Sequence, residues 1–178
     1  MKRLLALLLL IAVLGLALAA VFLRPMPPAP PAPPLPPIIG QIDHILIEKS
    51  ARRMQLFQNG QPVRTYPVAL GFTPDGDKTR QGDGRTPEGR FRIDRRNGQS
   101  AYHLSLGLDY PQPEDRARAA KAGYNPGGDI FIHGQPNALP DGYMLKGDWS
   151  AGCFAVTNRE MLEIWEVTPI GTEIEIRP

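Results

Sequence analysis

A mostly β fold with a few helices is predicted for residues 38–178 of this 178-residue chain, behind an apolar N-terminal segment. Short runs rich in β-branched and aromatic residues alternate with turn residues, which is typical of mostly β domains. The pair Asn59-Gly60 stands between two such runs, and it predicts a β-hairpin because both residue types tolerate positive φ. The region is long enough for one hydrophobic core.

Seven strands and two helices account for most of this region. Strands are expected at residues 42–47, 54–58, 63–70, 89–93, 102–106, 129–133 and 173–177, and helices at residues 114–122 and 158–167. The second helix has the stronger signal, because Thr157 and Glu160 have the spacing of a capping box before an apolar face. Residues 71–88 and 134–148 fit neither element, and loops of this length are usually functional or mobile.

Residues 1–24 have the composition of a signal peptide or a signal anchor. Lys2 and Arg3 precede an uncharged apolar run over residues 4–23, and about 20 apolar residues suffice to cross a bilayer. The basic start and the leucine-rich middle also fit a cleaved secretory signal. Apolar residues continue past the expected cleavage point, which favours an anchor in the inner membrane. Since the basic start stays inside, we expect the rest of the chain in the periplasm or cell envelope.

Residues 25–37 contain nine prolines and no charged residue. Proline fixes φ and donates no backbone hydrogen bond, so this stretch is expected to form an extended polyproline II linker. At ~3.1 Å per residue the linker would span about 40 Å and hold the domain away from a membrane. A disordered leader without a role is the alternative.

The charge of the domain excludes one class of partner. Lys2, Arg3 and Arg24 lie before residue 38 and all 18 acidic residues lie after it, so the net charge of +2 falls to about −1 for residues 38–178. No basic surface suited to nucleic acid is expected. No cofactor is expected either, because the single cysteine and three histidines have no zinc-ligand spacing. Asp75, Asp77 and Asp83 lack the calcium-loop pattern and are expected to be solvated.

Cys153 is the only cysteine, so an exported chain cannot use it for an internal disulfide. The thiol is therefore buried and inert, paired to another molecule, or reactive. Small residues precede it in Ser150-Ala151-Gly152-Cys153 and an apolar strand follows. Such neighbours let a substrate approach and leave the amides of Gly152 and Cys153 free to stabilise an oxyanion.

His133 ends an apolar strand and is followed by Gly134, so its ring is expected at a strand terminus. An imidazole beside a thiol lowers the thiol pKa and acts as a general base, as nucleophilic cysteine catalysis requires. A structural histidine is the alternative. His133 and Ser150 are separated by sixteen residues.

Together these residues resemble the signature of the L,D-transpeptidases of the YkuD fold, which is His-Gly, about 14 to 17 residues, then Ser or Thr, any residue, Gly and Cys. The Thr86-Pro87-Glu88-Gly89 segment is similar to a segment that precedes a strand in this family. The resemblance covers essentially all of residues 38–178. It implies a YkuD-like β-sandwich or barrel acting in cell-wall biogenesis and cell shape.

Two positions depart from the common family pattern. Ala151 stands where histidine is frequent, and Ala155 stands where Arg or Asn is common. Residues 151–158 resemble instead the murein-transpeptidase-related subgroup typified by YafK. An arginine at position 155 would suit a substrate carboxylate, so its absence leaves open which acceptor is used and whether the enzyme joins or cuts.

The resemblance implies that Cys153 attacks a carbonyl at an L,D junction of a peptidoglycan stem peptide, with His133 as base. Gly152 and Ser150 complete the implied catalytic set, although Ser150 also fits a plain turn residue. The implied substrate-binding residues are Gly134, His103, Trp149 and Tyr143, the last two at a loop that could cover the substrate. His103 also reads as an ordinary strand histidine, and surface packing is the alternative for the loop.

Three functions remain open: a transpeptidase, a hydrolase on the same scaffold (an L,D-carboxypeptidase or an enzyme releasing murein-linked protein), and a non-catalytic peptidoglycan-binding module. Stem peptides are the expected partner in each case. The sequence indicates no oligomeric state.

Overall fold

The computed structural model describes residues 35–140 and 142–178. The predicted signal or anchor over residues 1–24, and the predicted linker apart from its last three residues, lie outside this described part. Within the described residues, no helix combines the length and apolar character needed to cross a membrane. Residues 37–178 form one compact unit.

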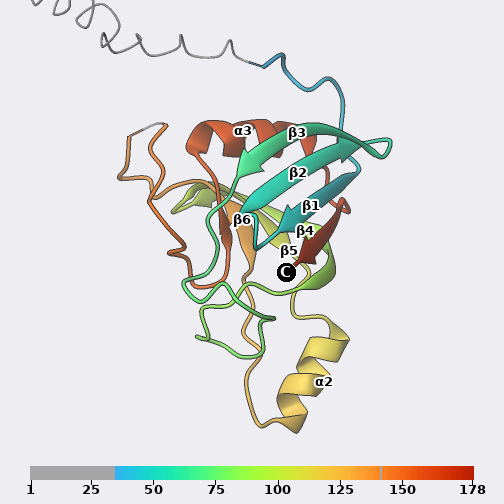
Figure 1. Ribbon diagram of the computed structural model, residues 1–178, viewed down its shortest axis with the longest axis vertical. Coiled ribbons are helices and arrows are strands. Elements are labelled where there is room, and N and C mark those ends of the chain that lie inside the picture. The colour runs from blue at the N-terminus through green and yellow to red at the C-terminus, as the bar shows by residue number, and fades with distance from the viewer. Residues whose placement is uncertain (1–34, 141) are drawn as a thin grey trace, which may run out of the picture. The chain divides into compact units, whose positions relative to one another are not determined.

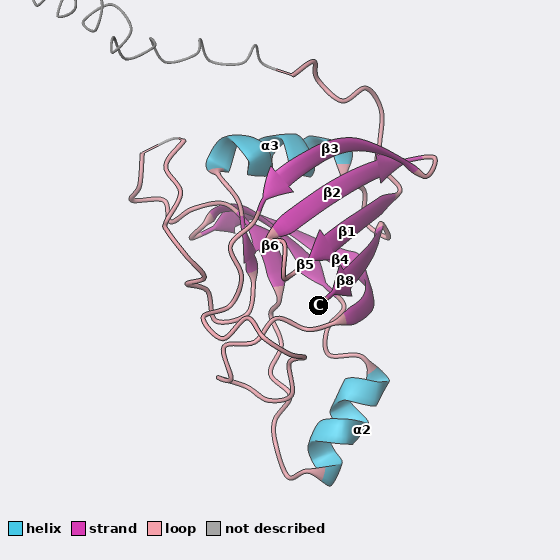
Figure 2. Cartoon of the chain, in the orientation of Figure 1, coloured by secondary structure: helices cyan, strands magenta, loops and turns pink. Residues whose placement is uncertain are grey.

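Eight strands form one mixed sheet in the order β3-β2-β1-β8-β4-β5-β6-β7 (Figure 1). The strands are β1 (His44–Glu48), β2 (Arg53–Gln58), β3 (Gln61–Pro67), β4 (Gly89–Ser100), β5 (His103–Leu108), β6 (Phe131–His133), β7 (Phe154–Ala155) and β8 (Glu173–Arg177). The described helices are α2 (Pro113–Lys121) and α3 (Asn158–Val167). The mostly β prediction with a few helices is confirmed, and Figure 2 shows how much of the unit is loop.

The expected sandwich or barrel is replaced by one open sheet. The first part of β4 pairs with β8 and the remainder pairs with β5, so this long strand belongs to both halves of the sheet. The edges β3 and β7 are linked among the described residues only through two isolated bridges that involve the segment after β3, Ala69 with Ala155 of β7 and Gly71 with Ser150. Closure is incomplete because β7 is only two residues long and cannot pair along the length of β3.

Local signals placed most elements correctly. Asn59 and Gly60 have φ of 51° and 73° in the β2–β3 turn, as the hairpin prediction requires. Thr157 and Glu160 form the predicted capping box of α3. β4 runs past its predicted end at residue 93 to Ser100, because pairing with β5 stabilises a polar segment with little strand signal of its own.

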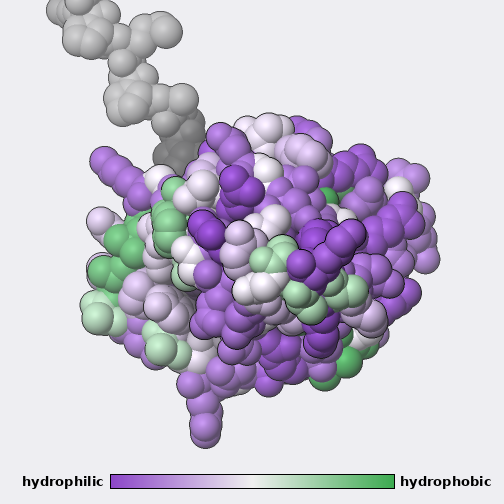
Figure 3. All heavy atoms as spheres, turned by 90° about the horizontal axis from the view of Figure 1, so that it is seen from below, coloured by the Kyte–Doolittle hydropathy of each residue, from purple (hydrophilic) through white to green (hydrophobic). Residues whose placement is uncertain are grey.

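The core lies between the sheet and α3. Met161, Ile164 and Val167 of α3 are buried in the same apolar cluster as the inward residues of the central strands. α2 lies at the opposite end of the unit from α3 (Figure 1). The face seen in Figure 3 is mostly hydrophilic and is interrupted by apolar patches.

The acidic loop over residues 71–88 is not uniformly solvated, contrary to the prediction. The side chains of Lys78 and Asp83 are only 2% and 7% exposed and form an ion pair at 2.7 Å. Asp77 accepts a hydrogen bond from the backbone N–H of Glu88 and pairs with Arg118 of α2. The sequence pattern could not reveal these partners because they are set by the folded path of the loop.

Candidate active site

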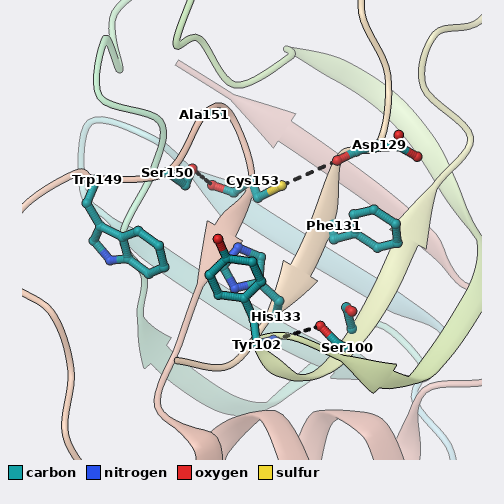
Figure 4. A pocket seen from close by; sticks show the side chains of 10 residues that line it. Ser100, Tyr102, Asp129, Phe131, His133, Trp149, Ser150, Ala151 and Cys153 are labelled. Carbon is teal, nitrogen blue, oxygen red and sulfur yellow. Dashed lines mark hydrogen bonds between the residues drawn. The ribbon is translucent and has the colours of Figure 1, made fainter. Parts of the chain in front are cut away.

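Two neighbouring strands bring Cys153 and His133 to one end of the sheet. β6 and β7 pair in parallel, with Ile132 opposite Phe154 and His133 opposite Ala155. Cys153 therefore comes immediately before β7, at the level of β6. Both residues line a cavity of about 390 Å³, which is drawn in Figure 4.

The turn that carries Cys153 is held by Ser150. The Ser150 hydroxyl accepts a hydrogen bond from the Gly152 N–H at 3.1 Å and donates one to the Cys153 carbonyl at 2.7 Å. Gly152 has a φ of 135°, and a Cβ atom there would lie 2.5 Å from the carbonyl oxygen of Arg85. The turn therefore requires glycine at this position, both for the backbone conformation and for the close approach of the residue 71–88 loop.

The Gly152 amide is less free than the sequence suggested. Because it donates to Ser150 in this arrangement, the expected oxyanion contact from Gly152 is not available without a change in the turn. The Cys153 amide remains as the other donor of the predicted pair.

His133 is buried, with 5% of its surface exposed, and its ring is held on several sides. Its Nδ1 lies 2.7 Å from the carbonyl oxygen of Gly134, which can only accept, so Nδ1 carries the proton of the neutral ring. The Tyr102 ring lies against the imidazole with centroids 4.7 Å apart, and the Trp149 ring meets it edge-on at 5.7 Å. This arrangement leaves Nε2 as the basic nitrogen.

Burial favours the neutral forms of both groups. It lowers the pKa of His133, and the contact with the Gly134 carbonyl only partly opposes this effect. Burial also raises the pKa of the Cys153 thiol, whereas the sequence led us to expect a pKa lowered by the imidazole. The thiol donates to the backbone carbonyl of Asp129 at 3.4 Å. Among the described residues no hydrogen bond joins Cys153 to His133, so the resting pair is a thiol and a neutral imidazole that face the same cavity.

Of the four predicted substrate-binding residues, the fold places one in the wall of the cavity. Trp149 lines the cavity, and its Nε1 is buried without a hydrogen-bond partner in the described part of the chain. Gly134 is not among the residues that line the cavity, and a Cβ there would lie 2.6 Å from Asn158 Oδ1. His103 stands at the β4–β5 turn with a φ of 66°, and Tyr143 is 47% exposed. Neither His103 nor Tyr143 is among the residues that line the cavity.

Sequence reasoning missed several residues of the cavity wall. These are Ser100, Tyr102, Ser105, Asp129 and Phe131. Ser105 lies directly opposite His133 in the β5–β6 ladder. Tyr102 immediately precedes His103, which the sequence suggested as a substrate contact. A register between β5 and β6 would have identified Ser105, but no local pattern specifies that register.

A second cavity, of about 530 Å³, opens on another side of Cys153. Its lining includes Lys78 and several loop glycines. Asp129, Ala151 and Cys153 line both cavities and form the boundary between them. No group of three or more His, Cys, Asp or Glu residues within residues 35–140 and 142–178 could hold a metal ion.

Comparison with known proteins gives a consistent result. The sequence model of the L,D-transpeptidase catalytic domain, YkuD, matches residues 42–176. YafK of Escherichia coli (strain K12), whose designation as an L,D-transpeptidase is provisional, is 26% identical over 72% of this chain and 48% of its own length. YkuD of Bacillus licheniformis, with the same provisional designation, is 28% identical over 75% of this chain and 65% of its own length.

Solved structures agree on the fold. The helical cell shape determining protein Pgp2 of Campylobacter jejuni superposes with a TM-score of 0.61 at 23% identity, over 77% of this chain and 48% of its own. Bd1075 of Bdellovibrio bacteriovorus gives 0.55 at 26% identity, over 77% of this chain and 48% of its own. This chain thus spans about half the length of YafK, Pgp2 and Bd1075.

Proposed function

Because the chain belongs to the L,D-transpeptidase catalytic domain family, we propose that it transfers acyl groups of peptidoglycan stem peptides through a thioester on Cys153. The observation that carries this proposal is the shared cavity of Cys153 and His133, with Nδ1 of the imidazole tied to Gly134 and Nε2 available as base. A nucleophile and a base in one cavity are the minimum that thioester chemistry requires.

Because Cys153 and His133 are both neutral at rest, the first step is transfer of the thiol proton to the imidazole. Substrate enters the cavity, His133 Nε2 takes the thiol proton, and the sulfur attacks the carbonyl carbon at the L,D junction. The Cys153 amide donates to the oxyanion that develops. The C–N bond then breaks, and the terminal D-amino acid leaves with the proton returned by His133. An amine from a second molecule, or water, next attacks the thioester and restores the thiol.

Ser150 and the aromatic residues have positioning roles in this scheme. Ser150 fixes the turn through its hydrogen bond to the Cys153 carbonyl. The Cys153 sulfur and the Cys153 amide N–H can then face the same carbonyl group of the substrate. Tyr102 and Trp149 hold the imidazole plane, which keeps Nε2 directed into the cavity.

We place this activity in the periplasm or cell envelope, with residues 4–23 as the anchor in the inner membrane. The support is the uncharged apolar run after Lys2 and Arg3 together with the peptidoglycan substrate. Protease treatment of intact spheroplasts tests it: the domain should be cleaved from outside. Protection until the cells are lysed would contradict the export of the domain.

The full-length protein incubated with a stem tetrapeptide that ends in D-alanine tests the activity. Mass spectrometry should reveal release of D-alanine and an acyl adduct on Cys153, and both should be absent in Cys153→Ala. Peptide binding without an adduct, equal in the wild type and in Cys153→Ala, would instead identify a peptidoglycan-binding module.

Hydrolysis is the second candidate, and Ala155 is the observation that favours it. This residue is buried on β7 and its methyl group has no hydrogen-bond donor, so Ala155 itself cannot hold the carboxylate of an acceptor. Cross-linked or exchanged products in the same assay indicate transfer, whereas trimmed peptides alone indicate an L,D-carboxypeptidase or an enzyme that releases murein-linked protein.

A further inference from the structure

Asn158, the first residue of α3, is joined to His133 through a single peptide group, the one between Gly134 and Gln135. The carbonyl of this group belongs to Gly134 and accepts from His133 Nδ1 at 2.7 Å. Its N–H belongs to Gln135 and donates to Asn158 Oδ1, also at 2.7 Å. Because a peptide group is planar, its carbonyl and its N–H turn together. The acceptor on Asn158 therefore fixes the direction of the carbonyl that holds the imidazole.

Gly134 permits this contact but gives the peptide group little support of its own. A Cβ at this position would lie 2.6 Å from Asn158 Oδ1 and 2.9 Å from His103 Cβ, so the close approach requires glycine. Glycine also populates backbone conformations that other residues avoid, so rotation of the peptide group that follows it costs little. A partner outside the loop has to hold this group in place.

The hydrogen bond between Asn158 and the Gln135 N–H is shielded from water. Asn158 is 7% exposed, and Gln135 has no exposed surface. A buried N–H without a partner is unfavourable, so loss of the Asn158 oxygen would favour a rotation that gives the Gln135 N–H a new acceptor. The same rotation would turn the Gly134 carbonyl away from His133 Nδ1.

The position of Asn158 is fixed by the segment that precedes it. Thr157 closes the first turn of α3 in a capping box with Glu160. Before Thr157, the Val156 N–H donates to the His133 carbonyl at 3.0 Å. The start of α3 is thus tied to the strand that carries the proposed base, and Asn158 can act as a fixed support for it.

A fixed Gly134 carbonyl determines which imidazole nitrogen acts as base. The carbonyl can only accept, so it holds the proton of neutral His133 on Nδ1 and leaves the lone pair on Nε2. Successive hydrogen bonds through one peptide group polarise each other, so the contact with Asn158 also strengthens the carbonyl as an acceptor. A stronger acceptor stabilises the imidazolium that forms when Nε2 takes the thiol proton.

We propose that Asn158 is a positioning residue for the proposed reaction and acts on His133 through the Gly134–Gln135 peptide group. This inference rests on the proposed function and adds a supporting residue to the pair of Cys153 and His133. Asn158 is not among the described residues that line either cavity beside Cys153. Its effect should therefore fall on proton transfer and not on binding of the stem peptide.

Three substitutions of Asn158 in the full-length protein separate the acceptor from the packing of the side chain. Asn158→Leu retains the volume and removes the acceptor, and Asn158→Ala removes both. Asn158→Asp retains an acceptor oxygen, and a carboxylate is favourable in the first turn of a helix.

Gln135→Met is the matched control for a general loosening of the same region. The Gln135 side chain donates to the Val156 carbonyl at 2.7 Å and accepts from the Leu145 N–H at 3.0 Å. Methionine removes both of these buried hydrogen bonds but retains the backbone N–H that donates to Asn158.

The first measurement is the tautomer of neutral His133, read from the NMR shifts of its ring nitrogens and assigned by comparison with His133→Gln. The proton should lie on Nδ1 in the wild type, in Asn158→Asp and in Gln135→Met. In Asn158→Leu and Asn158→Ala the population should shift toward a proton on Nε2. This measurement requires no turnover.

The second measurement is single-turnover acylation of Cys153 by the stem tetrapeptide. The maximal rate should fall about tenfold or more in Asn158→Leu and Asn158→Ala, because a general base contributes roughly 10²- to 10⁴-fold and part of the population has lost its basic Nε2. The peptide concentration that gives half the maximal rate should stay unchanged. Asn158→Asp should recover most of the rate.

Several outcomes would overturn the inference. These are a proton that stays on Nδ1 in Asn158→Leu and Asn158→Ala, an equal change of tautomer in Asn158→Asp or Gln135→Met, and an unchanged maximal rate. A wild-type protein that forms no thioester contradicts the proposed function instead. An unchanged tautomer in a protein that does form the thioester contradicts the role of Asn158 alone.

Discussion

The Ser150 hydroxyl donates a hydrogen bond of 2.7 Å to the carbonyl of Cys153, and the same hydroxyl accepts from the Gly152 N–H. One side chain thus closes the turn that presents the proposed nucleophile (Figure 4). Ser150 is 4% exposed, so water cannot easily replace it in this role.

Replacing Ser150 with alanine should lower both stability and the rate of Cys153 acylation. The change leaves the Gly152 N–H and the Cys153 carbonyl without this partner, which costs about 1–3 kcal/mol for a buried polar group. Urea denaturation measures the first effect, and the rate of the acyl adduct measures the second. Ser150→Thr retains a hydroxyl and should restore most of both, so a threonine variant as impaired as alanine would contradict this explanation.

Gly152→Ala should destabilise the fold more than an ordinary glycine substitution does. At φ 135° a Cβ would lie 2.5 Å from the Arg85 carbonyl oxygen, so a steric clash adds to the backbone strain. Strain contributes about 1–2 kcal/mol, and overpacking typically adds about 1–3 kcal/mol.

Gly82→Ala is the matched control for strain alone. Gly82 has a φ of 77°, but nothing lies within 4 Å of the added Cβ. Equal losses of unfolding free energy in the two variants would show that the approach of Arg85 to the turn is unimportant.

Asp83→Asn should destabilise the protein by about 3 kcal/mol at neutral pH, because it leaves the Lys78 ammonium buried without its counter-charge. Chemical denaturation of the variant and the wild type measures the difference. Asp75→Asn, in the same loop but exposed, is the control and should change stability little.

The ion pair between Lys78 and Asp83 also predicts that the free energy of unfolding falls in acid. Burial by itself raises the pKa of Asp83, but the hydrogen bonds from Lys78 and from the backbone amides of Arg80, Thr79 and Arg85 hold it at about 2, below the ordinary 3.8. As the pH falls, the unfolded chain therefore binds this proton first. The contribution of Asp83 is complete above about pH 4 and is lost as the pH falls toward 2. Asp83→Asn should lack this part of the wild-type pH profile.

The Cys153 thiol should react slowly with iodoacetamide, with a pH midpoint above the value of about 8.5 for an unperturbed cysteine, because burial raises its pKa. His133→Gln should leave this midpoint unchanged, since no imidazole contact stabilises the thiolate. The same variant should lower the rate of thioester formation by about 100-fold or more, because the base is lost. A wild-type midpoint well below 8.5 that rises in His133→Gln would indicate a resting thiolate–imidazolium pair instead.

Local sequence patterns determined most strand positions, the β2–β3 hairpin and the capping box of α3, because each depends on residues within a few positions of one another. The spacing from His133 to Ser150 and Cys153 determined the family, and the comparisons confirm it. The roles of these residues stay predictions, since the fold locates them in one cavity without testing what they do there.

Only the tertiary structure decided what surrounds the sulfur. Pairing of β5, β6 and β7 places Ser105 and Tyr102 at the His133 cavity and leaves His103 and Tyr143 outside its lining. The same pairing sets Asp129 against Cys153 and buries the thiol, which raises its pKa although the sequence suggested the reverse. Contacts and burial of this kind depend on strand register and loop path, which join residues distant in sequence, so no local pattern along this chain specifies them.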